Sequence, residues 1–244
     1  SPITHSYRGI TYKDLQTRVA SLAGALRAKG IEKGDRVIIY MPMVPEALEA
    51  MLACSRLGAT HSVVFGGFAA HELAVRIDDC TPKAIIAASC GLEPGRVVHY
   101  KPLLDRAIDE ATHKPEFCVI FQREQEVAEL IEGRDVAWHS FQFGVEPAEC
   151  VPVEGNHPHY ILYTSGTTGH PKAAVLTHGQ MAFVVTNHLC DLMPGTTEAD
   201  ASLALAPLSH GAGIHALTQI ARGVPTILPT SERFDAAEMW ALIE

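Results

Sequence analysis

Residues 36–65 decide the fold, and they read RVIIYMPMVPEALEAMLACSRLGATHSVVF. Residues 36–41 form a short apolar run without strict alternation, which is typical of a strand covered on both faces of a sheet. Pro45 suits the first turn of a helix that Gly58 would cap. A second apolar run follows at 61–65. Strand, helix and strand in this order predict a parallel βαβ unit.

The same alternation of helix and strand extends outward in both directions. Upstream, a capping-box pattern at 11–14 opens a helix with apolar residues at three- and four-residue steps, and Gly30 closes it. Downstream, we expect helices at 70–79, 102–111, 180–192 and 215–221. We expect strands at 84–87, 117–121, 160–163, 173–176, 203–206 and 226–228. This order predicts the α/β class, with doubly wound and mostly parallel sheets.

Residues 123–157 interrupt this rhythm. They carry many charges, three glycines and two prolines, with no clean period. We interpret them as a helix fragment and an irregular connection. The sequence therefore predicts a first α/β subdomain with its linker over 1–157. The start of a second α/β subdomain is predicted over 158–244.

Composition narrows the class of partner. The chain has 244 residues, of which 47% are hydrophobic and 19% charged, and its formal net charge is −9. Because no block of Lys and Arg stands out, a nucleic acid or an anionic membrane is not expected as a partner. No apolar run approaches the ~20 residues that a membrane span needs, and no signal peptide is visible. Six scattered cysteines without a C-x-x-C pair indicate reduced thiols and a cytoplasmic location.

The most specific motif is Tyr163-Thr-Ser-Gly-Thr-Thr-Gly-His-Pro-Lys172. Its two glycines allow the backbone to approach a ligand closely, and its backbone N–H groups can form an anion-binding nest. Lys172 adds a point charge suited to phosphate. The motif supplies four hydroxyl groups, on Thr164, Ser165, Thr167 and Thr168. Hydroxyl and amide donors with one cation on a glycine frame indicate a polyphosphate site.

This motif differs from a Walker A loop, in which the lysine directly follows a glycine and opens a helix. Here His170 and Pro171 intervene, and the apolar residues after Lys172 predict a strand. The alternative interpretation is a polar, glycine-rich hairpin turn without a ligand.

The whole string resembles the phosphate loop of the adenylate-forming, or AMP-binding, superfamily. That superfamily includes acyl-CoA synthetases, luciferase-like ligases and the adenylation domains of peptide synthetases. Residues 1–157 are most similar to acetyl- and propionyl-CoA synthetases, on the strings at 61–68, 76–79 and 101–105. Residues 160–244 are more similar to ligases of longer-chain or aryl acids, on the strings at 174–178 and 206–213.

The resemblance implies an ATP-dependent carboxylic acid:CoA ligase. A carboxylate and ATP would give an acyl-adenylate and pyrophosphate, and CoA would then take the acyl group as a thioester. The implied substrates are a small carboxylic acid, ATP and CoA, with Mg²⁺ as cofactor. Lys172 and Thr167 would be catalytic. The implied ligands of the ATP phosphates are Thr164, Ser165, Gly166, Thr167, Thr168, Gly169 and Lys172, with a possible Mg²⁺ contact at Thr168.

Two further sites follow from the resemblance. His210 and Gly211 would line the acyl-adenylate pocket. The less favoured alternative for His210 is a helix-capping or core histidine. Gly67 and Arg96 would contact CoA, although a plain turn and a surface arginine explain them as well. The sequence leaves open the acid and the oligomeric state.

The family's other ATP-binding residues lie downstream of such a loop, and so does its C-terminal lid domain. We therefore expect the rest of the N-terminal domain and the lid to be absent from these 244 residues. The chain alone should bind ATP weakly and form no acyl-CoA. Two alternatives stay open: an adenylation domain that loads a carrier protein, and a non-catalytic nucleotide-binding fragment.

Overall fold

The computed structural model describes residues 8–93, 96–164, 172–209, 211–231 and 234–243. Its main sheet has seven strands in the order β7-β6-β3-β1-β2-β8-β9. The strands are β1 (Arg36–Met41), β2 (Thr60–Phe65), β3 (Ala84–Ala88), β6 (Phe117–Phe121), β7 (Asp135–Ala137), β8 (Pro158–Thr164) and β9 (Lys172–Thr177). All neighbours are parallel except β8 and β9. The predicted α/β fold with a mostly parallel sheet is confirmed.

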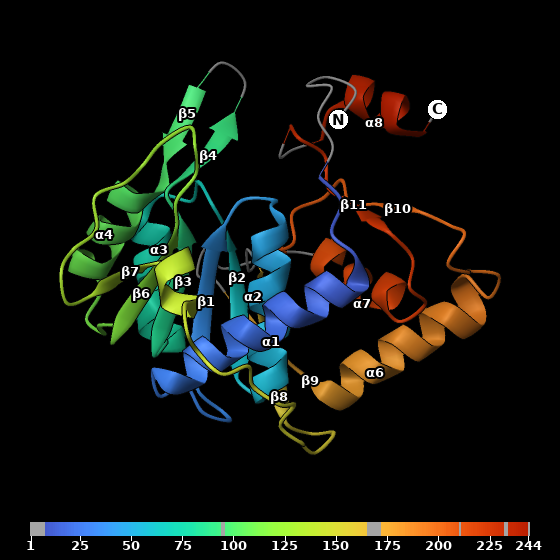
Figure 1. The fold of residues 1–244 in the computed structure, drawn as a ribbon, viewed down its shortest axis with the longest axis horizontal. Helices are drawn as coiled ribbons and strands as arrows, with labels where there is room; N and C mark the ends of the chain where they lie inside the picture. Colours follow the sequence, from blue (N-terminus) through green and yellow to red (C-terminus); the bar gives the residue numbers. More distant parts are fainter. Residues whose placement is uncertain (1–7, 94–95, 165–171, 210, 232–233, 244) are drawn as a thin grey trace.

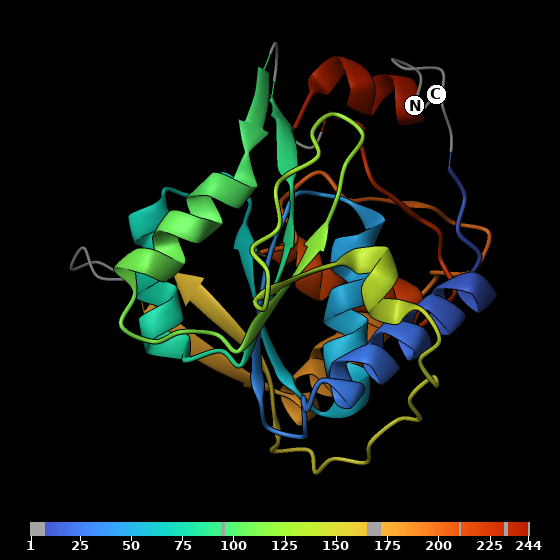
Figure 2. The ribbon, with the colours of Figure 1, turned by 60° about the vertical axis from the view of Figure 1, so that its left-hand side comes forward.

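Helices cover both faces of this sheet, as Figure 2 shows. One face carries α1 (Tyr12–Ala28), α2 (Pro45–Leu57) and α5 (Trp138–Gln142), and the other carries α3 (Ala70–Cys80) and α4 (Tyr100–Glu110). Local signals fix the helix ends. The Thr11 hydroxyl accepts the Asp14 N–H at the start of α1, and Gly58 ends α2 in the left-handed conformation at φ 69°.

The remaining elements lie outside the main sheet. They are β4 (Cys90–Glu93), β5 (Arg96–His99), α6 (His178–Asn187), the π-helical turn η1 (His188–Leu192), β10 (Ser202–Leu203), α7 (Gly211–Ile220), β11 (Thr226–Ile227) and α8 (Ala236–Ile243). β4 and β5 form an antiparallel pair, and β10 and β11 a parallel pair. Figure 1 shows α6 and α7 on the far side of α2 from α3 and α4.

Several elements differ from their sequence-based prediction. The β4–β5 hairpin, β7 and α8 were not predicted. The strands of the hairpin mix polar and apolar residues without strict alternation, and β7 and α8 are short. The strand expected at 203–206 spans only Ser202–Leu203. The helix expected at 180–192 begins at His178 and changes to a π turn at His188.

A buried ion cluster closes the core near β6 and β7. Lys101 of α4 has a side chain only 3% exposed, and its Nζ lies 2.9 Å from Asp135 Oδ2 and 2.6 Å from Asp105 Oδ2. Arg134 Nε lies 2.7 Å from Asp135 Oδ1. Hydrogen bonds from Arg134, the backbone and Lys101 lower the pKa of Asp135, and they outweigh the effect of its burial. Through the Lys101–Asp135 pair the cluster connects α4 to β7. Removing one partner would leave a buried charge unpaired, which costs much folding free energy.

Burial differs along the chain. Strands β1, β2 and β3 are almost wholly buried, whereas the first four residues of β9 are exposed. In α6 only Met181 is buried. Four cysteines, Cys54, Cys80, Cys90 and Cys118, are buried, and all six are free thiols. Within the described ranges, no helix is long and apolar enough to cross a membrane.

Candidate functional site

The phosphate-loop motif forms the end of an antiparallel hairpin. Thr164, the last residue of β8, pairs with Lys172, the first residue of β9. The Thr164 hydroxyl lies 3.5 Å from the Lys172 carbonyl oxygen. A strand, not a helix, begins at Lys172, as the sequence predicted. The pair is antiparallel because the intervening residues are too few for the crossover that parallel strands need.

The loop itself, residues 165–171, lies outside the described residues. The predicted phosphate ligands Ser165, Gly166, Thr167, Thr168 and Gly169 therefore have no structural description here. Thr164 and Lys172 are described, and both are exposed. An exposed lysine at the edge of the loop is accessible to an anion from solvent.

The loop end of the hairpin is attached to α3. The Tyr163 hydroxyl donates to Asp79 Oδ2 at 2.6 Å. Burial, together with this hydrogen bond to Asp79, raises the pKa of Tyr163. Tyr163 therefore stays protonated and can keep donating.

A second predicted segment is the turn after β2, which carries Gly66 and Gly67. The Tyr40 hydroxyl donates to the Phe68 carbonyl at 3.0 Å and accepts the Gly67 N–H at 3.3 Å. The Tyr100 hydroxyl donates to the Gly66 carbonyl at 2.7 Å. A Cβ on Gly66 would lie 2.0 Å from the Tyr100 ring, so Gly66 is needed for packing. Gly67 has φ +111° and open space beside it, so its glycine is needed for the backbone turn.

The predicted CoA residue Arg96 begins β5. Its side chain is 69% exposed, and its Nη2 lies 2.6 Å from Glu93 Oε2 on β4. Tyr100 connects this hairpin to the glycine turn, because a Cβ on Gly91 of β4 would also lie 2.0 Å from the Tyr100 hydroxyl oxygen. The glycine turn and the β4–β5 hairpin therefore pack against the same tyrosine.

The predicted acyl-pocket segment leads into α7. His210 lies outside the described residues, and Gly211 is the first residue of α7. The two preceding residues, Leu208 and Ser209, form hydrogen bonds with residues of the main-sheet region. The Ser209 carbonyl accepts the Tyr160 hydroxyl of β8 at 3.1 Å, and the Leu208 N–H lies 3.2 Å from Met43 Sδ. This segment therefore contacts β8, which is also one strand of the phosphate hairpin.

A cluster of histidines at the opposite end of the hairpin was not predicted. The cluster comprises His61, His159 and His178. The ring centroid of His159 lies 5.0 Å from that of His61 and 4.5 Å from that of His178. His159 Nε2 lies 2.7 Å from Ser55 Oγ, and His61 stacks on Tyr160. Burial, and then the neighbouring His178, lowers the pKa of His159 to about 4. The sequence positions of the three histidines are far apart, so no local pattern indicated this cluster.

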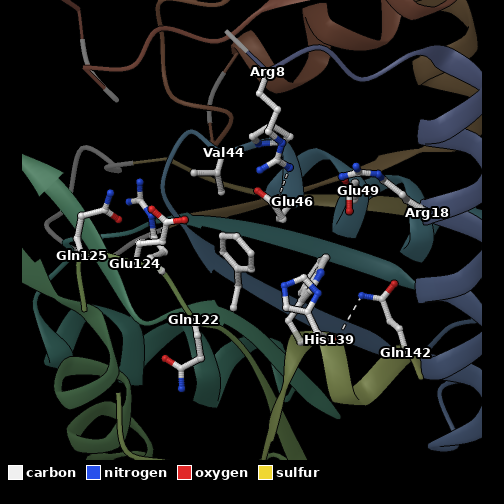
Figure 3. A pocket seen from close by; sticks show the side chains of 14 residues that line it. Arg8, Arg18, Val44, Glu46, Glu49, Gln122, Glu124, Gln125, His139 and Gln142 are labelled. Carbon is white, nitrogen blue, oxygen red and sulfur yellow. Dashed lines mark hydrogen bonds and ion pairs between the residues drawn. The ribbon is translucent and has the colours of Figure 1, made fainter. Parts of the chain in front are cut away.

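A cavity in the described part of the chain lies elsewhere, beyond the carboxyl ends of β1 and β6 (Figure 3). It has a volume of about 720 Å³. Its lining comprises Arg8, Arg18, Val44, Pro45, Glu46, Glu49, Phe121, Gln122, Arg123, Glu124, Gln125, Trp138, His139 and Gln142. Figure 3 shows Arg8 reaching down to Glu46, and Arg18 beside Glu49.

None of the sequence-predicted site residues lines this cavity. The edge of a parallel sheet where successive connections leave to opposite faces is the usual place for a ligand in open α/β folds. Here, however, the buried carboxylates Glu46 and Glu49 are each paired with an arginine. Burial, and then the charge of Glu46, raises the pKa of Glu49. The two buried carboxylates of this cavity are already neutralised by arginines.

The fold and the hairpin agree with what comparison of the whole sequence finds. Residues 2–244 match the model of the AMP-binding enzyme family. The chain belongs to this family, and the resemblance seen in the sequence is confirmed.

Individual proteins of known sequence are also similar to this chain. An uncharacterized protein of Pseudomonas aeruginosa is 56% identical over 76% of this chain and 30% of its own length. The human acyl-CoA synthetase short-chain family member 3, mitochondrial, is 43% identical over 86% of this chain and 33% of its own. The acetyl-coenzyme A synthetase of Streptomyces avermitilis is 42% identical over 84% and 34%. The chain spans about a third of the length of these relatives.

Proposed function

We propose that residues 1–244 form the ATP-phosphate-binding part of an AMP-forming carboxylic acid:CoA ligase. The observation that carries the proposal is the pairing of Thr164 with Lys172, which closes a short glycine- and hydroxyl-rich loop at the tip of an antiparallel hairpin. Membership of the AMP-binding enzyme family supports it. On this proposal, residues 1–157 and 158–244 belong to two adjacent subdomains of one larger catalytic domain.

The reaction would proceed in two steps. A carboxylate oxygen attacks the α-phosphorus of ATP, the bond from that phosphorus to the bridging oxygen breaks, and pyrophosphate leaves. The thiol sulfur of CoA then attacks the acyl carbon, its proton passes to solvent, and AMP leaves. Lys172 and the loop hydroxyls, with Thr167 foremost, would neutralise the charge that grows on the departing pyrophosphate.

Mg²⁺ would assist by neutralising phosphate charge. Within the part of the chain that the structure describes, however, no group of three or more His, Cys, Asp or Glu residues could hold a metal ion. The proposed Mg²⁺ contact at Thr168 lies outside that part.

The other substrates would meet the segments around β2 and β8. Gly67 and Arg96 would bind CoA, because the turn and the hairpin that carry them pack on the same Tyr100. His210 and Gly211 would line the acyl-adenylate pocket at the start of α7. We propose a short-chain carboxylic acid as substrate, because relatives that match most of this chain are a short-chain acyl-CoA synthetase and an acetyl-coenzyme A synthetase. We place the enzyme in the cytoplasm, although the named mammalian relatives are mitochondrial.

The test is ATP–pyrophosphate exchange by the intact protein that contains these residues, over acids from acetate to long-chain and aryl. We expect exchange with short acids and thioester formation with CoA. Exchange without CoA transfer, but with transfer to a carrier protein, would favour a carrier-loading domain. Absence of exchange with every acid would overturn the proposal.

Lys172→Ala gives the residue-level test. It removes one charge-assisted contact of about 1.5–3 kcal/mol, so exchange should slow about tenfold to a hundredfold. The KM for the acid should stay nearly unchanged. Lys13→Ala, which removes an exposed cation from α1, is the control and should keep the wild-type rate.

A further inference from the structure

Arg76 of α3 lies between two segments that the proposed reaction uses. Only 8% of the residue is exposed. Its guanidinium carbon lies 4.8 Å from the centre of the Phe68 ring and 5.4 Å from the centre of the Tyr163 ring. Phe68 ends the glycine turn, and Tyr163 precedes Thr164 in the hairpin. A planar cation is well suited to pack against two rings at once.

Two acidic residues of the same helix complete the arrangement. Arg76 Nη1 donates to the Glu72 carbonyl at 2.6 Å and lies 3.1 Å from Glu72 Oε2. Asp79 accepts the Tyr163 hydroxyl at 2.6 Å. Residues 72, 76 and 79 lie on one face of α3, because they are spaced four and three apart. Glu72 thus orients Arg76 while Asp79 holds Tyr163.

Pairing within the sheet does not hold the loop end of the hairpin in place. β8 pairs with β2 at one position, where His61 lies opposite Tyr160. Three residues further on, Tyr163 pairs with Ala173 of β9. β9 has its own partner only in β8 within the described sheet. The end of the hairpin that carries the phosphate loop therefore diverges from β2, and Figure 2 shows the two strands, in gold, running across towards α3.

We propose that Arg76, Asp79 and Tyr163 form a positioning link that holds the Thr164–Lys172 pair against α3 and ties it to the glycine turn. The proposal rests on the proposed function, in which this hairpin binds the phosphates of ATP. The three residues position the loop and need not touch substrate. A displacement of the loop by about 1 Å would slow adenylation, because the stabilising groups would no longer meet the departing pyrophosphate.

The first experiment is a double-mutant cycle in the intact protein. Tyr163→Phe and Asp79→Ala should each lower kcat for ATP–pyrophosphate exchange about fivefold to tenfold, with the KM for the acid within twofold. If both act through one hydrogen bond, the double variant should be no slower than the slower single variant. Effects that multiply in the double variant would overturn the link.

Conservative variants separate positioning from folding. Asp79→Asn keeps an acceptor for the tyrosine hydroxyl and should restore kcat to within about threefold of wild type. Arg76→Lys keeps the charge but loses the planar face, and should be as slow as Asp79→Ala. Tyr12→Phe is the matched control, because it removes a tyrosine hydroxyl that donates to the Val224 carbonyl at 2.6 Å, away from the hairpin. A loss of rate in that control equal to the loss in Tyr163→Phe would show a general effect of lost hydrogen bonds.

Hydrogen exchange on the 244-residue chain tests the link independently of catalysis. In Tyr163→Phe, amides of 158–164 and 172–177 should exchange several-fold faster, while those of β1 and β3 stay unchanged. Unchanged exchange in the hairpin would overturn the link even if the enzyme is active. An inactive wild-type protein whose hairpin still loosens in the variant would overturn the proposed function and leave the link standing.

Discussion

The sheet region around β1, β2 and β3 and the region from β9 to α8 belong to one chain, yet they bury their apolar side chains very differently. Ile38, Ile39 and Ile86 are fully buried, whereas Val175 of β9 is 53% exposed and Phe183 of α6 is 71% exposed. The first region has helices on both faces of its strands, whereas the first four residues of β9 are exposed. Stability should therefore reside mainly in the first region, and changes in the second should be tolerated.

The largest difference should come from the buried ion cluster. Lys101→Met leaves the fully buried Asp135 without one of its two cationic partners. We expect the free energy of unfolding to fall by about 3–5 kcal/mol, measured by urea denaturation. Arg106→Met, at an exposed pair on the same helix, should cost about 0.5 kcal/mol or less. Equal losses in the two variants would contradict a stabilising role for burial of the cluster.

Glycine substitutions should lower stability more in the first region than in the second. Gly66→Ala places a methyl group 2.0 Å from the Tyr100 ring, and overpacking of this kind costs about 1–3 kcal/mol. Gly195→Ala, after η1, meets nothing within 4 Å and should change stability by about 0.5 kcal/mol or less. Thermal unfolding of both variants measures the contrast. A tolerated Gly66→Ala would mean that the ring of Tyr100 can move aside.

Mild acid should weaken the contact between the two regions, because the histidine cluster spans it. His61 belongs to β2, while His159 and His178 lie on β8 and α6. Burial lowers the pKa of all three below the usual value of 6.5. The unfolded chain then binds more protons, so this stability is complete above about pH 6.5 and falls as the pH drops towards about 4.

The lowered pKa of His159, about 4 against the usual 6.5, by itself corresponds to a loss of about 2–3 kcal/mol between pH 7 and pH 4.5, read from urea denaturation at successive pH values. Asp135, whose pKa is lowered, should lose its contribution only at more acidic pH. His159→Gln should flatten the profile in this window. A profile that is already flat in the wild-type chain would contradict the low pKa of the cluster.

The smallest effect should come from the exposed face of α6. Phe183→Ser removes a ring that is 71% exposed, so the free energy of unfolding should change by about 0.5 kcal/mol or less. Urea denaturation at two protein concentrations measures it. A loss above about 1.5 kcal/mol, or one that depends on concentration, would show that another chain covers this face.

The same contrast explains what the sequence could predict. Strands β1, β2 and β3 and helix α2 were predicted closely, because continuous apolar runs and a proline and glycine at the two ends are local signals. The β4–β5 hairpin carried a usable signal in Pro94-Gly95, a turn dipeptide between its strands. Its mixed composition hid the strands themselves. The phosphate motif likewise predicted its two flanking strands, since everything needed lies within 163–176.

The partners of the hairpin could not be predicted. Tyr163 and Asp79 are 84 residues apart, and His61 meets Tyr160 across a similar separation. No local period encodes such contacts, because they depend on how strands pair and twist. The placement of β8 beside β2 in one sheet was invisible for the same reason. The division at residue 157 stays a prediction.

The antiparallel pairing of β8 and β9 also has a consequence for the order of folding. The two strands are joined by a seven-residue loop, so they can pair within about 1–10 μs. Joining β8 to β2 must instead close a loop between residues 61 and 160, at a higher entropic cost. The hairpin should therefore form first and dock later. During that interval its side edge is open to other chains, so the yield of folded protein should fall as protein concentration rises during refolding.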